Sequence, residues 1–475
     1  MAPTSLGMTS KEEPKERCMK SSQAHGHFVP LIVAFVGLPA RGKTVLAHKL
    51  ERYLNYTGHL ARVFSLSTYR RKLAPDIGCD FIFDPQNEEA TEIRKQYTHE
   101  AINDCKQWIY IGGDIAILDG TYAAMDVRQL LYSLFVKQLG FKILFIECIV
   151  EDEILLEGNI NDTVRLSEDY AHLEYNQAVK EIQKKIKQFS STYVPISKNT
   201  ESIFSYIKFY NAGENIFVHR IDGPFQTKVL NFVSCFRPMR KKTLYFTRHG
   251  ESEFNLLGRI GGDTDLSPRG HFYATLLAKY FNSNKIENLR VWTSEKKRTK
   301  QTANGIKAPV ESLAPLNELD AGICEGMTYE EIQMKFPQEF AWRDQDKLRY
   351  RYPWGESYID IMSRLELVLL ELEREDSLLV ISHQAVLRCV LGYFLNTESD
   401  KVPYLGVPLH TVIKLTINGY DWNVDYIKFN VDCVDTYRSQ PENCSVDRSN
   451  EDVLVTIPKH FDSNPWRKEP TLINI

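Results

Sequence analysis

The C-terminal half of the chain contains the sequence RHGES at residues 248–252, directly after the apolar run Leu244–Thr247. A histidine at the end of a strand is suited to attack phosphorus, because its imidazole has an unprotonated nitrogen near neutral pH. The guanidinium of Arg248 can neutralise phosphoryl oxygens through charge-assisted hydrogen bonds. The pattern therefore indicates phosphoryl transfer through His249.

The N-terminal half contains a second phosphate-binding pattern, GLPARGKT at residues 37–44, between an apolar run and a segment with helical spacing. In such a loop the backbone N–H groups surround phosphates, the lysine reaches the outer phosphates, and the threonine hydroxyl can bind Mg²⁺. Asp119 ends another apolar run, where it is expected to orient Mg²⁺ or to accept a substrate proton. The predicted nucleotide-binding residues are Gly37, Ala40, Arg41, Gly42, Lys43 and Thr44, with Thr44 and Asp119 as metal ligands.

The composition is that of a soluble globular protein, since 43% of the 475 residues are hydrophobic and 25% are charged. A net charge of −4 argues against a general nucleic-acid binder. Nine cysteines without CxxC pairs favour a reducing, cytoplasmic environment over a disulfide framework or a zinc site. No apolar run is long enough to span a membrane, so no membrane association is expected.

Apolar strand-like runs alternate with helical spacing along both halves, which predicts an α/β fold with two parallel sheets. In the first half, strands are expected at 31–36, 61–66, 115–118, 142–148 and 205–210, and helices at 44–54, 87–108, 127–139 and 173–189. In the second half, strands are expected at 243–247, 290–293 and 378–382, and helices at 270–281, 357–373 and 385–395.

A proline- and charge-rich break at residues 237–242 predicts the boundary between two domains. We expect a flexible arm over 1–28, a first domain over 29–238, a second over 239–437 and a mobile polar tail over 438–475.

Several residues elsewhere in the second half complement His249. Arg298 and His383 follow separate apolar strands, and Glu318 lies between them in sequence. The carboxyl ends of parallel strands meet at one edge of a sheet, so these side chains are expected to converge. Arg248, Arg298 and His383 would stabilise the transferring phosphoryl group, while Glu318 would protonate the leaving oxygen and later activate water. No metal is expected at this site.

With these motifs, the chain resembles the bifunctional 6-phosphofructo-2-kinase/fructose-2,6-bisphosphatase family over residues 29–437. The matching stretches are GLPARGKT, 69–71 (YRR), 93–96 (IRKQ) and nearly all of the second half, which resembles the histidine phosphatase (phosphoglycerate mutase-like) superfamily. The resemblance implies a P-loop kinase domain similar to nucleoside monophosphate kinases, which uses ATP to make fructose 2,6-bisphosphate from fructose 6-phosphate. It also implies a second domain that hydrolyses the 2-phosphate, and a homodimer formed through the kinase domains.

The resemblance further implies residues that bind the sugar phosphates. In the kinase domain these are Arg70, Arg71, Arg94 and Thr121. In the phosphatase domain they are Asn255, Gly261, Tyr329, Arg343, Lys347, Tyr350, Arg351, Gln384 and Arg388. Without the resemblance, the basic segment 343–351 would be interpreted as a solvated helical face. Tyr358, Ile361 and Leu365 have helical spacing and are expected in the core.

The kinase half departs from the family pattern at several positions. The pattern Asp-Ala-Thr-Asn-Thr-Thr-Arg is replaced by DGTYAAM at 119–125, which removes an asparagine, two hydroxyls and an arginine. Family arginines or lysines also correspond to Val127, Val164 and Lys185, although Arg128 and Arg165 lie adjacent to the first two. The lost asparagine, hydroxyls and arginine correspond to Tyr122, Ala123, Ala124 and Met125. Each lost charge-assisted contact is worth about 1.5–3 kcal/mol, so we expect a kinase that binds ATP but phosphorylates fructose 6-phosphate slowly.

The leading hypothesis is therefore a bifunctional enzyme biased toward the phosphatase. A second hypothesis keeps only the phosphatase active, with the first domain an ATP-binding regulator. A metabolite-binding scaffold, a phosphomutase and a phosphoprotein phosphatase are weaker alternatives, because they leave either the nucleophile with its acid or the P-loop unexplained.

Overall fold

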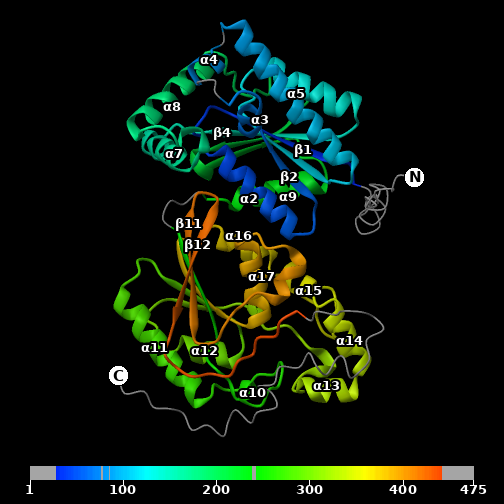
Figure 1. Cartoon of the computed structure of the whole chain (residues 1–475), viewed down its shortest axis with the longest axis vertical. Helices are drawn as coiled ribbons and strands as arrows, with labels where there is room; N and C mark the ends of the chain where they lie inside the picture. Colours follow the sequence, from blue (N-terminus) through cyan, green and yellow to red (C-terminus); the bar gives the residue numbers. More distant parts are fainter. Residues whose placement is uncertain (1–27, 76–78, 85, 238–241, 441–475) are drawn as a thin grey trace, which may run out of the picture. The chain divides into compact units, whose positions relative to one another are not determined.

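The structure, a computed structural model, describes residues 28–75, 79–84, 86–237 and 242–440. The chain divides into two compact units, Met1–Pro238 and Met239–Ile475, drawn blue to green and green to red in Figure 1. The predicted arm, apart from Phe28, and the predicted tail beyond residue 440 lie outside the described residues. No helix of the described chain is long and apolar enough to cross a membrane.

The first unit is built on a six-stranded sheet with the order β2-β3-β1-β4-β5-β6. All neighbouring strands are parallel except β6, which runs antiparallel to β5. The strands are β1 (Leu31–Val36), β2 (Ala61–Ser65), β3 (Ile115–Asp119), β4 (Lys142–Ile149), β5 (Ser205–Tyr210) and β6 (Asn215–His219).

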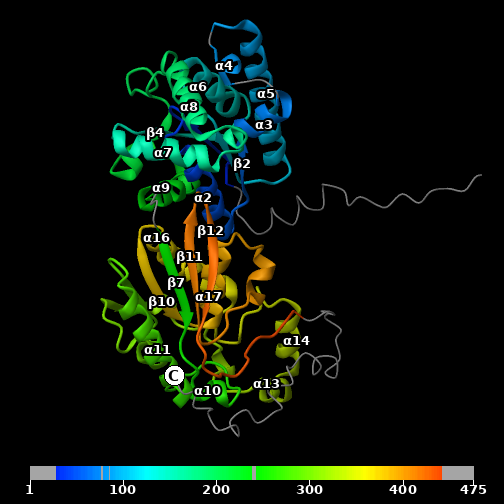
Figure 2. The ribbon, with the colours of Figure 1, turned by 60° about the vertical axis from the view of Figure 1, so that its left-hand side comes forward.

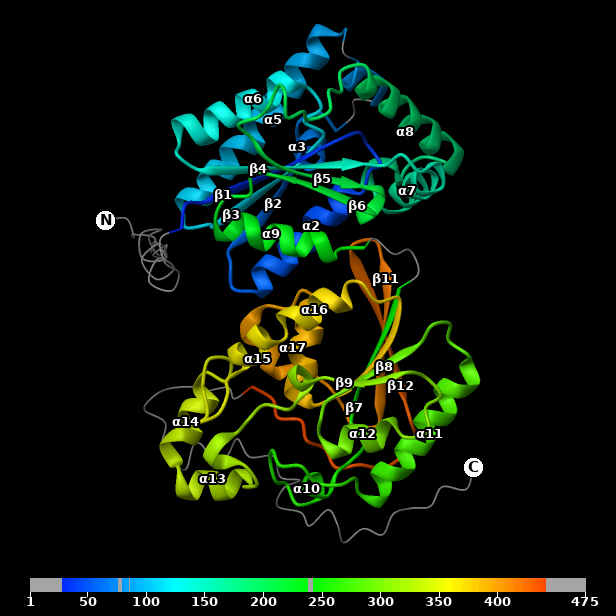
Figure 3. The ribbon, with the colours of Figure 1, turned by 180° about the vertical axis from the view of Figure 1, so that it is seen from behind.

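Helices cover both faces of this sheet, with α5 and α6 on one side and α2 and α9 on the other (Figure 3). Strands buried on both faces must be apolar throughout, and every residue of β1 is buried. The helices are α2 (Lys43–Tyr56), α3 (Leu66–Leu73), α4 (Cys79–Ile82), α5 (Glu88–Tyr110), α6 (Met125–Tyr132), α7 (Glu153–Leu166), α8 (Tyr175–Ser190) and α9 (Gly223–Cys235). Short helical turns occupy Ser133–Gln138, Glu168–Tyr170 and Asn211–Gly213.

The predicted strands of this unit are confirmed to within one residue, and the errors lie elsewhere. The expectation that 205–210 is the last strand is wrong, because β6 follows it. β6 is short and lies at the edge of the sheet, where three of its five side chains are exposed and no buried apolar pattern is needed. The expected helix 127–139 is divided, since α6 ends at Tyr132 and continues as the π-helix Ser133–Gln138.

The second unit also contains a six-stranded sheet, with the order β12-β11-β7-β10-β8-β9. The four strands β7 to β10 are parallel, and the hairpin β11–β12 adds two antiparallel strands at one edge. The strands are β7 (Thr243–Arg248), β8 (Arg290–Thr293), β9 (Val310–Ser312), β10 (Ser377–Ser382), β11 (Thr411–Asn418) and β12 (Asp421–Lys428). β9 and this hairpin were not predicted from the sequence.

Helices α11 and α17 pack on opposite faces of this sheet (Figure 2). Alternate residues of β7 point to the two faces: Tyr245 contacts Phe281 of α11, and Phe246 contacts Phe394 of α17. The helices are α10 (Glu253–Leu256), α11 (Pro268–Asn284), α12 (Lys297–Ala303), α13 (Tyr329–Lys335), α14 (Pro337–Gln345), α15 (Tyr358–Arg364), α16 (Glu366–Leu372) and α17 (Gln384–Phe394). The predicted helix 357–373 is divided at Leu365 into α15 and α16. Three-residue turns lie at Ala314–Leu316 and Gly322–Cys324, and a longer one lies at Ser399–Tyr404. The predicted α/β class with two sheets is confirmed.

Candidate active sites

The GLPARGKT segment forms the turn between β1 and α2. Gly37, Ala40 and Gly42 have positive φ values of 127°, 57° and 78°, so the chain curls through conformations that favour glycine. A Cβ atom at Gly37 would lie 2.4 Å from the carbonyl oxygen of Cys148 in β4. This glycine is therefore required by the close approach of the loop to the sheet.

A cavity of about 220 Å³ lies beside this loop, and Lys43 lines it. The Lys43 side chain is buried, and its Nζ donates to the carbonyl oxygen of Leu38 at 2.5 Å. Burial lowers the pKa of Lys43 to about 8, against the opposing effects of Cys148 and Asp119. An anion in the cavity would stabilise the charged lysine, as expected for a phosphate ligand.

Three oxygen-bearing side chains meet at the edge of the cavity. Thr44 Oγ1 and Ser65 Oγ each donate to Asp119 Oδ2, both at 2.9 Å. The register of the sheet explains the meeting, because Ser65 at the end of β2 pairs with Asp119 at the end of β3. Mg²⁺ prefers oxygen ligands, and one carboxylate and a hydroxyl are typical protein ligands when substrate phosphates and water complete the coordination shell. These residues therefore fit a magnesium ion, and Ser65 was not predicted.

The predicted sugar-phosphate residues of this unit are only partly brought together. Arg70 and Thr121 line the cavity. Arg71, Arg94 and Gly37 do not line it. Arg94 instead donates to the carbonyl oxygens of residues 82 and 84 at 2.7 and 3.0 Å.

In the second unit, the sheet register brings the two histidines together. Arg248 at the end of β7 pairs with Ser382 at the end of β10, so the residues that follow are neighbours. The His249 N–H donates to the Ser382 carbonyl at 2.9 Å, and the imidazole rings of His249 and His383 have centroids 5.2 Å apart. The predicted convergence of these strand ends is therefore observed.

The hydrogen bond of His249 defines its tautomer. Nδ1 lies 2.7 Å from the carbonyl oxygen of Gly250, which can only accept, so Nδ1 carries the hydrogen. Burial, together with Arg298 and Arg248, holds the pKa of His249 well below its usual value. The imidazole is then neutral at physiological pH, and Nε2 has the free lone pair of a nucleophile.

Two buried arginines flank this nucleophile. Arg248 Nη1 donates to Thr436 Oγ1 at 2.8 Å, and Arg298 Nη1 donates to the carbonyl oxygen of Gly262 at 2.7 Å. Burial lowers the pKa of Arg248 to about 10, and that of Arg298 is also lowered by burial. Both remain cationic at neutral pH and supply positive charge for a phosphoryl group.

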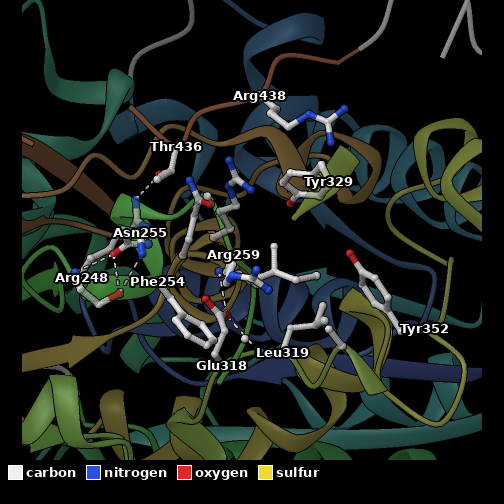
Figure 4. Close-up of a pocket in the computed structure, with 18 of the residues that line it drawn as sticks. Arg248, Phe254, Asn255, Arg259, Glu318, Leu319, Tyr329, Tyr352, Thr436 and Arg438 are labelled. Carbon is white, nitrogen blue, oxygen red and sulfur yellow. Dashed lines mark hydrogen bonds between the residues drawn. The ribbon is translucent and has the colours of Figure 1, made fainter. Parts of the chain in front are cut away.

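Glu318 lies in the same pocket, as Figure 4 shows. Its Oε1 accepts from the backbone N–H groups of Leu319 at 3.0 Å and Ala385 at 3.3 Å. The other oxygen, Oε2, makes no hydrogen bond within the described residues and is available to exchange a proton.

The pocket has a volume of about 140 Å³ and extends from His249 to a group of basic and aromatic residues. Predicted residues that line it are Arg248, His249, Asn255, Gly261, Arg298, Glu318, Tyr329, Arg343, Lys347, Tyr350, Gln384 and Arg388. Arg351 is not brought into the pocket, since its side chain is exposed and pairs with Asp360, and its role in substrate binding stays a prediction.

Other lining residues were not predicted. Tyr358, expected only in the core, lines the pocket and accepts from Arg388 through its hydroxyl at 3.2 Å. Thr436 and Arg438 also line the pocket. Arg438 was assigned to the mobile tail, but it is buried against the ring of Tyr329.

Comparisons with known proteins place each half of the chain in a family. Residues 18–239 match the 6-phosphofructo-2-kinase family, and residues 244–430 match the histidine phosphatase superfamily, branch 1. A human protein named 6-phosphofructo-2-kinase/fructose-2,6-bisphosphatase 1 is 44% identical over 433 residues, which is 91% of each chain. The chain belongs to the 6-phosphofructo-2-kinase/fructose-2,6-bisphosphatase family. A bullfrog (Aquarana catesbeiana) member is 42% identical over 94% of this chain and 96% of its own. Among solved structures, a putative alpha-ribazole-5'-P phosphatase from Escherichia coli is 22% identical over 41% of this chain and 99% of its own, with a TM-score of 0.37.

The departures from the family pattern have structural consequences. Tyr122 is buried in the core with a positive φ of 35°, and its Cε2 would lie 2.8 Å from a Cβ at Gly120. Arg128, adjacent to the position of a lost arginine, is completely buried. It donates to Glu201 through Nε at 2.8 Å and through Nη2 at 2.9 Å, so it cannot replace that arginine.

The side chains now at the changed positions also have defined surroundings. Val127 and Val164 pack against hydrophobic clusters. Lys185 lines the cavity beside the 37–44 loop, and its Nζ lies 4.4 Å from the centroid of the Phe83 ring.

Proposed function

We propose that the enzyme sets the concentration of fructose 2,6-bisphosphate, which it makes at the first site and hydrolyses at the second. The family assignment supports both activities, because each half matches a family of the corresponding enzyme. The observation that carries the phosphatase assignment is the neutral His249 beside His383 and two buried arginines.

The hydrolysis is proposed to proceed in two displacements. His249 Nε2 attacks the phosphorus of the 2-phosphate, and the bond between phosphorus and the sugar oxygen breaks as Glu318 protonates that oxygen. Arg248, Arg298 and His383 stabilise the charge on the transferring group. Water, deprotonated by the Glu318 carboxylate, then attacks the phosphohistidine, releases inorganic phosphate and restores His249.

At the first site, the 2-hydroxyl of fructose 6-phosphate is proposed to attack the terminal phosphorus of ATP. The bond from that phosphorus to the bridging oxygen breaks, ADP leaves, and the hydroxyl proton is released to solvent. Lys43 and the backbone of the 37–44 loop hold the ATP phosphates, while Arg70 and Thr121 face the acceptor sugar. Mg²⁺, held by Thr44 and Asp119, would offset the negative charge of the phosphates when bound. The changes at 119–125 make this the slower site.

Two assays test this function. Incubation with fructose 2,6-bisphosphate labelled in the 2-phosphate should leave acid-labile label on the wild-type protein and none on His249→Ala. Incubation with ATP, Mg²⁺ and fructose 6-phosphate should yield bisphosphate slowly, and Tyr122→Asn combined with Met125→Arg should increase the rate. A protein that forms no phosphohistidine would refute the phosphatase. A kinase rate that stays at zero in both proteins would favour a purely regulatory first domain.

The assembly and location follow the same proposal. The family resemblance supports a homodimer in the cytoplasm that acts on small molecules, and neither nucleic acid nor membrane is proposed as a partner. Native mass spectrometry of the full chain would test the dimer, because a mass of one chain at micromolar concentration contradicts it.

A further inference from the structure

After β12 the chain continues as an extended segment, residues 431–438, which we call the C-terminal strap. Its side chains alternate between exposed and covered positions: Val434 and Arg438 are buried and Thr436 is half-buried, whereas the residues between them are exposed. An extended chain presents alternate side chains to opposite sides, so one side of the strap faces the rest of the unit.

The strap is fastened to residues beside the nucleophile. The backbone N–H of Val434 donates to Glu251 Oε2 at 2.9 Å. His410 Nε2 accepts from the Glu251 N–H at 3.0 Å, so its Nδ1 carries the hydrogen and donates to the Val431 carbonyl at 3.1 Å. Glu251 is held in turn by Arg269 at 2.7 Å. The position of the strap is therefore coupled to the loop that presents His249.

Two strap residues reach opposite ends of the phosphatase pocket (Figure 4). Thr436 accepts from Arg248 at the catalytic end. Arg438 lies over the ring of Tyr329, with its guanidinium carbon 4.5 Å from the ring centroid. Its Nη2 forms an ion pair with Asp344 Oδ2 at 3.6 Å.

The end of the pocket that contains Arg438 has excess positive charge. Arg343, Lys347, Arg388 and Arg438 are all buried, and Asp344 is the carboxylate that contacts Arg343 and Arg438. Burial, Arg388, Arg343 and Arg438 together hold the pKa of Lys347 well below its usual value. Arg388 Nη2 is buried and makes no hydrogen bond within the described residues. Such a cluster is stabilised by a bound anion.

We propose that Arg438 is a specificity-determining residue of the phosphatase site, whose guanidinium binds the phosphate of the sugar that is not removed. This inference rests on the proposed hydrolysis of a sugar bisphosphate. The first phosphate is bound at His249, and the second is bound between Arg438 on the strap and the three basic residues of the pocket wall. The strap thereby contributes one contact to each end of the substrate.

Arg438→Met tests the proposal, because methionine retains an apolar stem over Tyr329 but has no charge. Loss of a charge-assisted contact should raise the KM for fructose 2,6-bisphosphate about 10- to 100-fold and leave kcat unchanged. The inhibition constant of fructose 6-phosphate should rise by the same factor. The inhibition constant of vanadate, which occupies the catalytic end alone, should not change. Arg438→Lys should recover part of the affinity.

The matched control is Arg349→Met, the same change at an exposed arginine outside the pocket. If Arg438→Met behaves like this control, Arg438 does not bind the second phosphate. The inference is also wrong if kcat falls and the vanadate inhibition constant rises by as much as the KM rises, or if the melting temperature falls. The role of Arg438 would then be structural. A wild-type protein that forms no phosphohistidine would instead refute the proposed function itself.

Discussion

The hydrogen bonds around His383 lead to a prediction about a residue that the sequence analysis did not select. His383 Nε2 lies 2.7 Å from Ser294 Oγ, and Ser294 Oγ also accepts from the Lys296 N–H at 3.2 Å. Ser294 Oγ and Thr299 Oγ1 lie 2.9 Å apart, and the Ser294 hydrogen is free for His383 when Thr299 is the donor of that pair. Ser294 can therefore donate its hydrogen to His383 Nε2. Burial, Arg298 and His249 keep the pKa of His383 low, so its single hydrogen is then on Nδ1.

This tautomer matters because His383 Nδ1 is buried and has no hydrogen-bond partner within the described residues. With a hydrogen on Nδ1, the neutral ring can donate to the phosphoryl group bound at His249. Ser294→Ala removes the donor to Nε2, so the hydrogen can move to that nitrogen and Nδ1 then faces the phosphoryl oxygens as a second acceptor. A hydrogen bond to a charged group is worth about 1.5–3 kcal/mol. Its loss should therefore lower kcat by about 10- to 100-fold.

The assay is single-turnover formation of phosphohistidine from labelled bisphosphate, with the His383 tautomer followed by ¹⁵N NMR. Ser294→Ala should slow the reaction and shift the His383 hydrogen from Nδ1 to Nε2. Ser312→Ala removes an exposed hydroxyl that contacts Thr293 and serves as the control. Wild-type kinetics and an unchanged tautomer in Ser294→Ala would refute this account.

Two further predictions concern stability. A methyl at Gly120 would clash with Leu66 and with Tyr122, so Gly120→Ala alone should lower the free energy of unfolding by about 1–3 kcal/mol. The cost should be smaller in a Tyr122→Asn background, and urea unfolding of the four variants of the cycle measures that coupling; additive costs would contradict the contact. The second prediction concerns His249, His383 and His410, whose pKa values are all lowered, chiefly by burial. Below pH 6.5 the unfolded chain binds more protons at these histidines than the folded chain, so stability should fall as the pH falls from 6.5. The loss at pH 5.5 is at most about 1.4 kcal/mol for each histidine. A melting temperature that is the same at pH 7.5 and 5.5 would contradict these pKa directions.

The parts that the sequence predicted are those with local signals. β1 and β10 are continuous apolar runs followed by chemically distinctive residues, so their ends could be assigned without a structure. The meeting of His249 and His383 followed from a general rule about parallel strands. Arg343 and Arg351 show the limit of this approach, since both are basic residues in one short segment. Only packing decides that Arg343 is buried in the pocket and Arg351 is exposed.

The contacts that the sequence could not predict are long-range and lack a pattern. Thr436 reaches Arg248 from 188 residues away, out of a segment that forms no strand. Single hydrogen bonds to Glu251 and His410, which no sequence pattern encodes, fasten this segment to the unit. The burial of Arg128 could not be predicted for a related reason, because a charged residue near a helix start is usually exposed, whereas here it pairs with the buried carboxylate of Glu201.

The two sites also differ in how their arginines are balanced. Arg70 and Arg71 both contact Asp169 Oδ1 at 2.7 Å, so an acceptor phosphate at the first site must compete with a carboxylate already in place. In the phosphatase pocket, Arg248 and Arg298 donate only to hydroxyl and carbonyl oxygens, and their charges are not neutralised by a contacting carboxylate within the described residues. A phosphate entering this pocket gains full charge pairing, whereas one entering the first site exchanges one partner for another. We expect this asymmetry to favour net hydrolysis, in addition to the proposed effect of the changes at residues 119–125. Asp169→Asn should accordingly lower the KM for fructose 6-phosphate in the kinase reaction, and an increase would show that Asp169 orients the two arginines rather than competing for them.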